Sequence, residues 1–299
     1  MSARRSGDGP DGLVVVDKDA GWTSHDVVAK SRGLLGTRKV GHSGTLDPDA
    51  TGVLLLGVGR VTRLLKYLTA LPKTYTCEIV FGTETSTLDA AGEITATHDM
   101  SALTFDEVVA AIPALTGPIM QIPPMVSAVK VDGKRLHQLA REGIEVERAP
   151  RPVTIHRFTV EPTDDPLVVR AEVECSSGTY VRTLAADLGT ALGGGAHLRE
   201  LRRTSIGTFT LQDAHRLEKV SPEVLLTPAE AMRDHVVVVV DEAERIDVGH
   251  GKVLTIDERF SGEGPWAVVD VDGRLLAMYI AHRNGTAKPD VVVAPVDGR

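Results

Sequence analysis

One stretch of the chain carries residue types that suit chemistry on a bound ligand. Gly41–Arg63 (GHSGTLDPDATGVLLLGVGRVTR) places Asp47 before a proline and close to a second acid, Asp49. Glycines and small hydroxyl residues surround the two acids, and a short apolar run follows them. A Gly-rich, Pro-restricted loop at the mouth of a buried strand is a common way to present one side chain to a ligand. We therefore expect a functional acid on this loop.

Two further segments offer partners for this acid. Tyr75 lies near the start of an alternating apolar stretch, and Tyr180 and Arg182 lie between a predicted strand and a predicted helix. If the segments meet, Arg182 would keep Asp47 ionised and lower its pKa by about 1–3 units. An ionised carboxylate is a poor general acid but a useful nucleophile, and tyrosine rings stack on planar rings. Such a set of residues suits chemistry on a nucleobase.

Each of these residues also has an ordinary structural interpretation. An Asp-Pro-Asp sequence commonly closes a loop as an Asx-turn. Tyr75 and Tyr180 fit core aromatic residues, and Arg182 fits an exposed cation on a helix. His42, in the same loop as Asp47, fits a histidine that only hydrogen-bonds within the loop. Spacing alone leaves both interpretations open.

The pattern disfavours other kinds of site. Residues 36–43 (GTRKVGHS) nearly match the phosphate-binding loop GxxxxGK[ST], but His42 occupies the lysine position and a helix is predicted before it. Two acids beside one proline cannot easily straddle a sugar ring, which disfavours glycosidase chemistry. The ten histidines form no ligand-like cluster, and the two cysteines are too few for a structural zinc site. We expect no metal.

Strands and helices must hold these loops. Buried strands are predicted at Leu13–Lys18 and Gly52–Val58, and half-buried strands, from their alternation, at Lys73–Phe81 and Leu167–Cys175. Helices are predicted from Thr23 or Ser24 to about Leu35, Arg60 to about Ala70, Thr104 to about Leu115, and Ser176–Thr179 to about Leu192. Thr104 and Glu107, three positions apart, are predicted to form a capping box at the start of the third helix. A hairpin is predicted at Val131–Lys134, and a short basic helix follows it at Arg135–Arg141.

The composition changes near residue 220. A helix is predicted around Pro228–Arg233, and from about residue 235 the chain becomes acidic, with β-like runs that include Trp266–Asp270 and Leu275–Ile280. We therefore expect a small β domain over residues 235–299 after a larger domain over residues 13–232. Residues 1–12 are polar and Gly-rich, and we expect them to be disordered.

The net charge of −8 argues at first against a nucleic-acid partner, but the charge is unevenly distributed. Residues 1–66 carry 10 Lys/Arg against 7 Asp/Glu, residues 126–157 carry 7 against 4, and residues 196–219 carry 5 against 3. Binding to a phosphate backbone depends on local basic surface, so RNA binding is compatible with this sequence. No apolar run reaches the length of a membrane span, and we expect a cytoplasmic protein.

Four blocks of sequence, in order over roughly residues 13–210, together resemble the TruB family of tRNA pseudouridine-55 synthases. The blocks are GHSGTLDPDATGVLLLGVGRVTR, KTYTCEIVFGTETSTLDAAGEI, IPPMVSAVKVDGKRLHQLAREG and CSSGTYVRTLAADLG. The resemblance implies an α+β fold with a mixed, mostly antiparallel sheet of the pseudouridine synthase type, flanked by helices. It also implies an RNA-contacting insertion at about residues 100–150 and a small C-terminal β domain resembling a PUA domain.

The resemblance implies that uridine-55 in the tRNA T-loop is isomerised after base flipping, without cofactor or metal. Asp47 matches the family's nucleophile, Tyr75 the tyrosine that stacks on the target base, and Arg182 the arginine paired with the acid. Tyr180 matches a tyrosine that contacts the flipped nucleotide. Two further matches complete the substrate site: His42, linked to base flipping, and Leu201, which lines the uracil pocket.

The implied partner is the T-arm of tRNA, bound by a monomer with no obligate protein partner and no membrane attachment. RNA backbone contacts are expected from six basic residues: Lys18, Arg63, Lys130, Lys134, Arg135 and Arg141. His137 stands where the family pattern has a tyrosine, and Asp49 where it usually has an apolar residue. The competing hypothesis is an RNA-folding chaperone with a vestigial pocket, which would fold tRNA without isomerising uridine.

Overall fold

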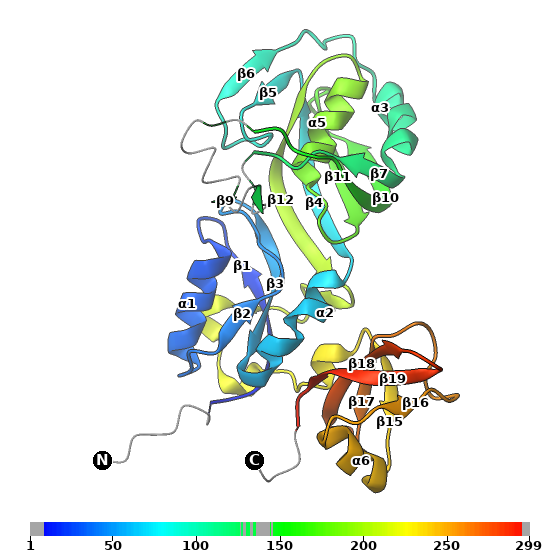
Figure 1. Ribbon diagram of the computed structural model, residues 1–299. Helices are drawn as coiled ribbons and strands as arrows, with labels where there is room; N and C mark the ends of the chain where they lie inside the picture. The colour runs from blue at the N-terminus through cyan, green and yellow to red at the C-terminus, as the bar shows by residue number, and fades with distance from the viewer. Residues whose placement is uncertain are drawn as a thin grey trace.

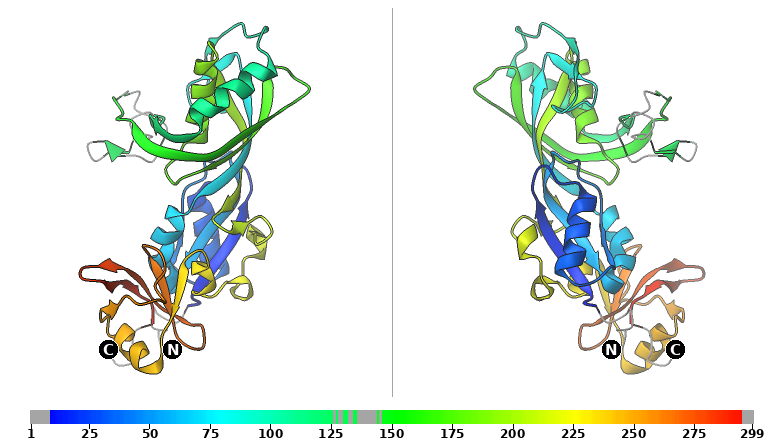
Figure 2. Two further views of the ribbon diagram at one scale, coloured as in Figure 1. Left: turned by 90° about the vertical axis from the view of Figure 1, so that its right-hand side faces the viewer. Right: turned by 90° about the vertical axis from the view of Figure 1, so that its left-hand side faces the viewer.

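The computed structural model describes residues 9–294, except residues 126, 128, 129, 132, 133, 136–143 and 145. The described chain forms a 10-stranded sheet, a 5-stranded sheet and two small hairpins. Figures 1 and 2 show an elongated molecule with the smaller, C-terminal sheet at one end. The large sheet contains the loop with Asp47 and the other predicted site residues, so it determines how they meet.

The large sheet runs in the order β14-β1-β3-β12-β4-β11-β10-β7, with β2 paired to β3 and β13 to β12. It is mostly antiparallel, with parallel pairs only between β1 and β14 and between β3 and β12. Its strands are β1 (Gly12–Lys18), β2 (Val40–His42), β3 (Thr51–Val58), β4 (Lys73–Phe81), β7 (Gly117–Gln121), β10 (Arg151–Pro162), β11 (Val168–Cys175), β12 (Ala196–Ile206), β13 (Phe209–Thr210) and β14 (His215–Arg216). The predicted α+β fold with a mostly antiparallel mixed sheet is confirmed.

The alternating strands behave as predicted. Along β4, residues Tyr75, Cys77, Ile79 and Phe81 are buried, whereas the residues between them are half-buried. On β11, Ala171, Val173 and Cys175 point into the same core, while the charged residues between them face the other side of the sheet. Because the side-chain period of a strand is two, this pattern sets which face of the sheet receives the helices.

Helices cover one face of each half of the large sheet. The helices of this region are α1 (Ser24–Leu34), η1 (Gly59–Leu64), α2 (Leu65–Ala70), α3 (Phe105–Ala111), η2 (Ile112–Leu115) and α5 (Val181–Ala191). Figure 2 shows α1 against the half built from β1 to β3, and α3 with α5 against the other half. Helix α1 begins at a capping box between Thr23 and Asp26, and α3 at the predicted box between Thr104 and Glu107.

Four predicted helices differ from the observed ones. The helix predicted from Thr104 to about Leu115 is an α-helix, α3, only as far as Ala111 and continues as the 3₁₀ segment η2. The helix predicted from Arg60 to Ala70 is split into the 3₁₀ segment η1 and the α-helix α2. Helix α5 begins only at Val181, because Gly178 adopts a left-handed φ of 88° that interrupts a helix. The helix predicted around Pro228–Arg233 is a single 3₁₀ turn, η5 (Glu230–Met232), and two similar turns precede it, η3 (Leu217–Lys219) and η4 (Pro222–Val224).

The loops that carry chemistry emerge where β1 ends and β3 begins, inside the sheet. Lys18, at the end of β1, pairs with Gly52 at the start of β3, and His42 ends β2 on the opposite side of β3. Gly52 has a φ of 102°, and a β-carbon there would lie 2.1 Å from the carbonyl oxygen of Arg203. A glycine is therefore required where β3 meets β12, next to the loop that holds Asp47.

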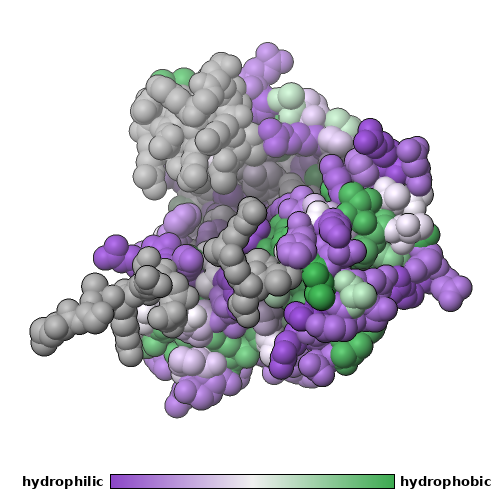
Figure 3. Space-filling view, turned by 60° about the horizontal axis from the view of Figure 1, so that its bottom comes forward, coloured by the Kyte–Doolittle hydropathy of each residue, from purple (hydrophilic) through white to green (hydrophobic). Residues whose placement is uncertain are grey.

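The smaller sheet runs in the order β15-β17-β18-β19-β16 and is accompanied by α6 (Glu242–Gly249). Its strands are β15 (Val236–Val239), β16 (Leu254–Thr255), β17 (Trp266–Val269), β18 (Leu275–His282) and β19 (Thr286–Val292). Figure 3 shows that the described surface at this end of the molecule is mostly hydrophilic, with apolar side chains in small groups.

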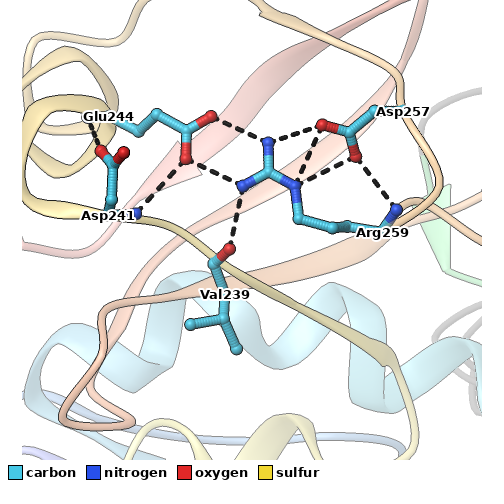
Figure 4. A network of polar contacts seen from close by, with 5 residues as sticks. All are labelled: Val239, Asp241, Glu244, Asp257 and Arg259. Atoms are coloured by element: carbon cyan, nitrogen blue, oxygen red, sulfur yellow. Dashed lines mark hydrogen bonds and ion pairs between the residues drawn. The ribbon is translucent and has the colours of Figure 1, made fainter.

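A cluster of ion pairs ties the loop after β16 to α6 in this sheet (Figure 4). Both terminal nitrogens of Arg259 donate to Glu244 at 2.8 Å, and the same guanidinium donates to Asp257 at 2.7–3.0 Å. It also donates to the carbonyl of Val239 at 3.0 Å. Asp241 caps α6 by accepting a hydrogen bond from the Glu244 amide at 2.8 Å. This cluster fixes the start of α6 against the edge strand β15.

The two sheets share a hydrophobic core. Leu64 and Leu68, beside the large sheet, belong to the same buried cluster as Met278 and Val291 of the small sheet. Polar contacts follow the same seam, where Lys66 and Tyr67 of α2 both bind the carboxylate of Asp290. The small sheet is therefore packed directly on the helix that leads into β4.

Two hairpins stand apart from the sheets. One pairs β5 (Thr83–Thr85) with β6 (Ile94–Thr97), and the residues between them form a loop that returns to the large sheet. The other pairs β8 (Lys130–Val131) with β9 (Lys134–Arg135), as predicted for this segment. The basic helix predicted over residues 135–141 lies outside the described residues, apart from Arg135, which is part of β9.

Candidate active site

One cavity of about 630 Å³ opens beside the loop that holds Asp47. Its walls come from parts of the chain that are far apart in sequence: residues 44–50, the beginning of β4, residues 87–91, residues 176–182 and residues 198–203. Five of the predicted site residues line it: Asp47, Tyr75, Tyr180, Arg182 and Leu201. A cavity of this size accommodates a small planar ligand such as a nucleobase with its sugar.

The loop that holds Asp47 is closed by a tight turn. The Ala50 amide donates to the Asp47 carbonyl at 3.1 Å, with Pro48 at the second position of the turn. The Pro48 carbonyl in turn accepts hydrogen bonds from the Gly21 amide at 2.9 Å and from the Lys18 ammonium at 3.0 Å. The loop is therefore fixed to the end of β1 before any ligand arrives.

Arg182 joins two acids at the cavity wall. Its guanidinium lies 3.1 Å from the Asp47 carboxylate and 3.2 Å from that of Asp89, which belongs to the loop between β5 and β6. The Arg182 side chain is only 7% exposed, whereas that of Asp47 is 44% exposed toward the cavity. The arginine is thus part of the protein interior, and the Asp47 carboxylate remains open to a ligand.

The electrostatic setting of Asp47 differs from the prediction. Burial in the cavity raises the pKa of Asp47 above its ordinary value, and the negative charge of Asp89 adds to this effect. The positive charges of Arg182 and Lys18 oppose it without reversing it. Arg182 lowers the pKa of Asp47 as predicted, but the net shift is upward, because the prediction left out the cost of burying the carboxylate and the charge of the second acid on the same guanidinium.

Tyr75 forms one wall of the cavity from strand β4 and is 9% exposed. Burial raises the pKa of its phenol, which keeps the hydroxyl protonated at neutral pH. Arg203, 1% exposed on β12, lies against the Tyr75 hydroxyl and donates to the carbonyls of Val53 at 2.7 Å and Gly44 at 3.3 Å. Arg203 therefore connects the aromatic wall to both ends of the Asp47 loop.

Tyr180 occupies the N-cap position of α5, directly before Val181 and Arg182. Its amide donates to the Gln121 side chain at 2.8 Å, and its carbonyl accepts from the same side chain at 3.1 Å. Gln121 is buried at the end of β7, so this pair of hydrogen bonds fixes the start of α5. The position of Arg182 in the next residues of the helix follows from it.

Leu201 reaches the cavity through an irregularity in β12. The pairing of β12 with β4 shifts register between Arg199 and Arg202, and Glu200 adopts a left-handed φ of 56°. An extra residue in one strand of an antiparallel pair is a β-bulge, which redirects the side chains around it. The bulge brings Leu201 to the cavity wall between Tyr75 and the loop of residues 87–91.

Models of two parts of one protein family match the chain. The TruB family pseudouridylate synthase N-terminal domain matches residues 32–181, and the tRNA pseudouridylate synthase B C-terminal domain matches residues 182–243. The chain belongs to the TruB family. The border between the two family models falls inside α5, so it separates residues that the structure joins in one large sheet.

Curated relatives cover nearly the whole chain. A tRNA pseudouridine synthase B of Arthrobacter sp. (strain FB24) is 48% identical over 95% of this chain and 97% of its own length. Another, of Rhodococcus jostii (strain RHA1), is 50% identical over 95% of this chain and 94% of its own length. Among solved structures, a chain of a Cbf5-Nop10-Gar1 complex aligns with a TM-score of 0.74 at 24% identity, over 96% of this chain and 86% of that chain. At this identity, the structural match establishes the shared fold only.

Lys18 is the predicted residue whose role the structure corrects. Its side chain is 1% exposed, and its ammonium donates to the carbonyls of Asp19, Trp22 and Pro48 at 2.7–3.0 Å. Burial lowers its pKa to about 8. A buried ammonium with three carbonyl partners does not reach an RNA backbone, so in this TruB-family protein Lys18 braces the Asp47 loop instead.

His42 does not line the cavity, although it lies in the loop before it. Its ring packs edge-to-face on His25 of α1, with ring centroids 5.3 Å apart. Burial lowers the pKa of His42, and the nearby His25 adds to this effect. His42 is therefore favoured in its neutral form beside the site, and its link to base flipping stays a prediction.

The basic residues predicted to contact RNA lie in two places. Arg63 is exposed on η1, and its guanidinium donates to the Val292 carbonyl of the small sheet at 2.8 Å. Lys130, Lys134 and Arg135 lie on the β8–β9 hairpin, for which the backbone alone is described. Arg141 and His137 lie outside the described residues.

Sequence reasoning missed Asp89 and Arg203. Asp89 lies in the quoted block KTYTCEIVFGTETSTLDAAGEI, but no role was assigned to it from the sequence. Arg203 stands in a basic run and looks like a surface residue. An acid inside a matched block, far from any basic residue in sequence, is the one signal that pointed toward Asp89.

No group of three or more His, Cys, Asp or Glu residues in the described part of the chain is arranged to hold a metal ion. No described helix has both the length and the apolar character needed to cross a membrane.

Proposed function

We propose that this TruB-family protein is a tRNA pseudouridine synthase that isomerises uridine-55 in the T-loop of tRNA. The observation that carries the proposal is the Asp47 carboxylate, exposed to a cavity and 3.1 Å from the buried guanidinium of Arg182. The aromatic wall of Tyr75 beside it suits a planar base. The curated relatives named tRNA pseudouridine synthase B support the choice of RNA.

The proposed reaction is an isomerisation in which no atoms are gained or lost overall. The N1–C1′ bond of uridine breaks, the uracil turns, and C5 bonds to C1′. The proton on C5 is lost to solvent and N1 takes up a proton, so the ring returns to the neutral form. Asp47 is the nucleophile, and Arg182 holds its carboxylate in place and offsets part of the cost of burying its charge.

The target base must leave its stack to reach a cavity of this kind, which costs a few kcal/mol. Stacking on Tyr75 would recover about 1–3 kcal/mol of that cost. Leu201 supplies an apolar contact to the ring, and Tyr180 contacts the flipped nucleotide from the start of α5. His42, beside the cavity in neutral form, takes part in displacing the base from the T-loop.

The rest of the T-arm is proposed to bind outside the cavity. Phosphate contacts come from Arg63 on η1 and from the β8–β9 segment, with Lys130, Lys134, Arg135 and Arg141. The small C-terminal sheet over residues 235–299 is a PUA-like RNA-binding domain in this proposal, and residues 13–232 are the catalytic domain. The protein acts as a cytoplasmic monomer with no obligate protein partner.

Tritium release from a tRNA transcript labelled at C5 of uridine tests the proposal directly. The wild-type protein is expected to release tritium, and Asp47→Asn is expected to release none while still binding the transcript. Release by Asp47→Asn at the wild-type rate would refute the nucleophile assignment. Refolding of tRNA by both proteins, with release by neither, would instead favour the RNA-folding chaperone.

A further inference from the structure

The chain contains two tryptophans in opposite environments. Trp266 lies in the core of the small sheet and is 1% exposed, whereas Trp22 is 37% exposed in the loop between β1 and α1. An exposed indole is unusual, because tryptophan is highly buried on average. Burial in the core accounts for Trp266, whereas packing does not account for the exposed indole of Trp22.

Trp22 is fastened to the loop that carries the proposed nucleophile. Its carbonyl accepts a hydrogen bond from the Lys18 ammonium at 2.7 Å, and the same ammonium donates to the Pro48 carbonyl at 3.0 Å. The amide of Gly21, the preceding residue, donates to the same Pro48 carbonyl at 2.9 Å. Pro48 follows Asp47 directly, so the Trp22 backbone lies beside the rim of the cavity.

The residues after Trp22 are also fixed by hydrogen bonds. Thr23 forms the capping box of α1 with Asp26. Ser24 is fully buried, and its hydroxyl accepts from the Leu46 amide at 2.9 Å and donates to the Leu46 carbonyl at 3.2 Å. The indole therefore extends from a backbone that is fixed on both sides to the Asp47 loop. Because the backbone on both sides is already fixed, covering the indole with a ligand requires no ordering of the chain that carries it.

The surroundings of Trp22 suit one flat ligand rather than a protein surface. Its neighbours Asp19, Ala20, Gly21 and Thr23 are all exposed, and none has a large apolar side chain. Protein docking surfaces are usually contiguous apolar patches. A single aromatic ring among small and polar residues, next to a nucleobase-sized cavity, matches the stacking platforms that hold unpaired bases in RNA-binding proteins.

We propose that Trp22 stacks on an unpaired base of the RNA substrate next to the nucleotide that enters the cavity. This inference rests on the proposed function, since it takes the substrate to be an RNA loop. Stacking on the rim would hold the neighbouring base while the target nucleotide is turned inward. Trp22 is thus a substrate-binding residue, and it does not touch the reacting atoms.

Tryptophan fluorescence isolates this contact. All titrations use a T-arm stem-loop RNA and the Asp47→Asn background, so that no turnover occurs. With the added change Trp266→Phe, only Trp22 emits, and RNA is expected to quench that emission along the binding curve. With Trp22→Phe instead, only the buried Trp266 emits, and its emission is expected to stay constant. Emission from Trp22 that does not change when RNA saturates the protein, as measured by filter binding, would overturn the proposal.

Affinity gives a second, independent readout in the wild-type background. Trp22→Ala is expected to weaken binding of the stem-loop about tenfold and to raise KM with little change in kcat. Trp22→Phe keeps an aromatic face and is expected to restore most of the affinity, whereas Trp22→Leu keeps only the apolar bulk and is not. Val109→Ala is the matched control, because Val109 is 44% exposed on α3 and outside the cavity. Equal affinity of Trp22→Ala and Val109→Ala would contradict the stacking role.

The two proposals fail in different ways. Quenching of Trp22 without tritium release from the wild-type protein would leave the stacking platform standing and refute the proposed reaction. Tritium release with no effect of Trp22→Ala on KM would refute the platform and leave the reaction standing. A protein that does not bind the stem-loop at all would refute both.

Discussion

The large and the small sheet each contain an arginine held between two carboxylates, and the two clusters differ in whether an acid faces a cavity. Arg259 donates to both oxygens of Glu244 at 2.8 Å and to Asp257 at 2.7–3.0 Å. Arg182 lies 3.1 Å from Asp47 and 3.2 Å from Asp89, and both of these acids line the cavity of about 630 Å³.

The pKa values of the acids in the two clusters shift in different directions. Hydrogen bonds from Arg259 lower the pKa of Glu244 and of Asp257, as expected for acids stabilised by a structural ion pair. The pKa of Asp47 moves in the opposite direction, because burial outweighs Arg182. Perturbed pKa values are common at functional sites, so the upward shift of Asp47 fits the nucleophile role proposed for it.

The largest expected difference between the clusters comes from neutralising Asp47. Asp47→Asn is expected to abolish tritium release while leaving the melting temperature unchanged or slightly higher. The sign follows from linkage: a raised pKa in the folded state means that the ionised acid lowers stability at neutral pH, and asparagine removes that cost. A melting temperature that falls by several degrees would show that Asp47 belongs with the structural acids.

Substitution of Asp89 tests whether this acid positions Arg182 for the reaction or only stabilises the fold. Asp89 holds Arg182 from the side opposite Asp47, so Asp89→Asn is expected to let the guanidinium shift and to slow single-turnover isomerisation about 100-fold. Binding of the stem-loop should change little. The matched control is Asp106→Asn, an exposed acid on α3 outside the cavity. Equal rates for the two variants would remove Asp89 from the site.

Disrupting the Arg259 cluster in the small sheet is expected to lower stability and to leave the isomerisation rate unchanged. Arg259→Met leaves Glu244 and Asp257 without their shared partner, and we expect a modest fall in the urea midpoint, because ion pairs between partly exposed groups contribute little each. The isomerisation rate of the folded protein should be unchanged. Arg274→Met is the control, since Arg274 is 78% exposed and 4.0 Å from its acid. Equal urea midpoints for the two variants would contradict the structural role.

Local pattern predicted four of the ten strands of the large sheet, β1, β3, β4 and β11. The period of two predicted β4 and β11 with the correct face inward, and the capping box at Thr104 marked the start of α3. The helix from Arg60 to Ala70 was predicted as one element, whereas it is divided into η1 and α2, and both segments pack in one core with residues of the small sheet. Helix propensity depends on residues that are close in sequence, so it does not show where contacts with distant residues interrupt a helix.

The site residues that lie in the family-like sequence blocks at matching positions could be predicted, whereas roles that depend on contacts in the folded protein could not. The family blocks led to Asp47, Tyr75 and Arg182, which line a common cavity. Lys18 was predicted to contact RNA because it is basic. A sequence does not show whether an ammonium is exposed to solvent or donates to three carbonyls in the interior, as that of Lys18 does. Asp89 was missed for a related reason: its contact with Arg182 joins positions 93 residues apart.

The smallest predicted effect concerns the second acid of the loop. Asp49 makes the weakest contribution among the charges that act on Asp47, and like Asp89 it raises the pKa of that carboxyl, whereas Arg182 and Lys18 lower it. If ionised Asp47 is required, activity falls as the pH drops through its pKa, and Asp49→Asn should move that decline slightly toward lower pH. The rate at neutral pH should stay the same, because Asp49 has no place in the proposed reaction. A pH profile of single-turnover tritium release, with Arg182→Met shifted toward higher pH for comparison, measures both displacements. A loss of the neutral-pH rate in Asp49→Asn would make it a participant in the chemistry and not only a residue of the turn.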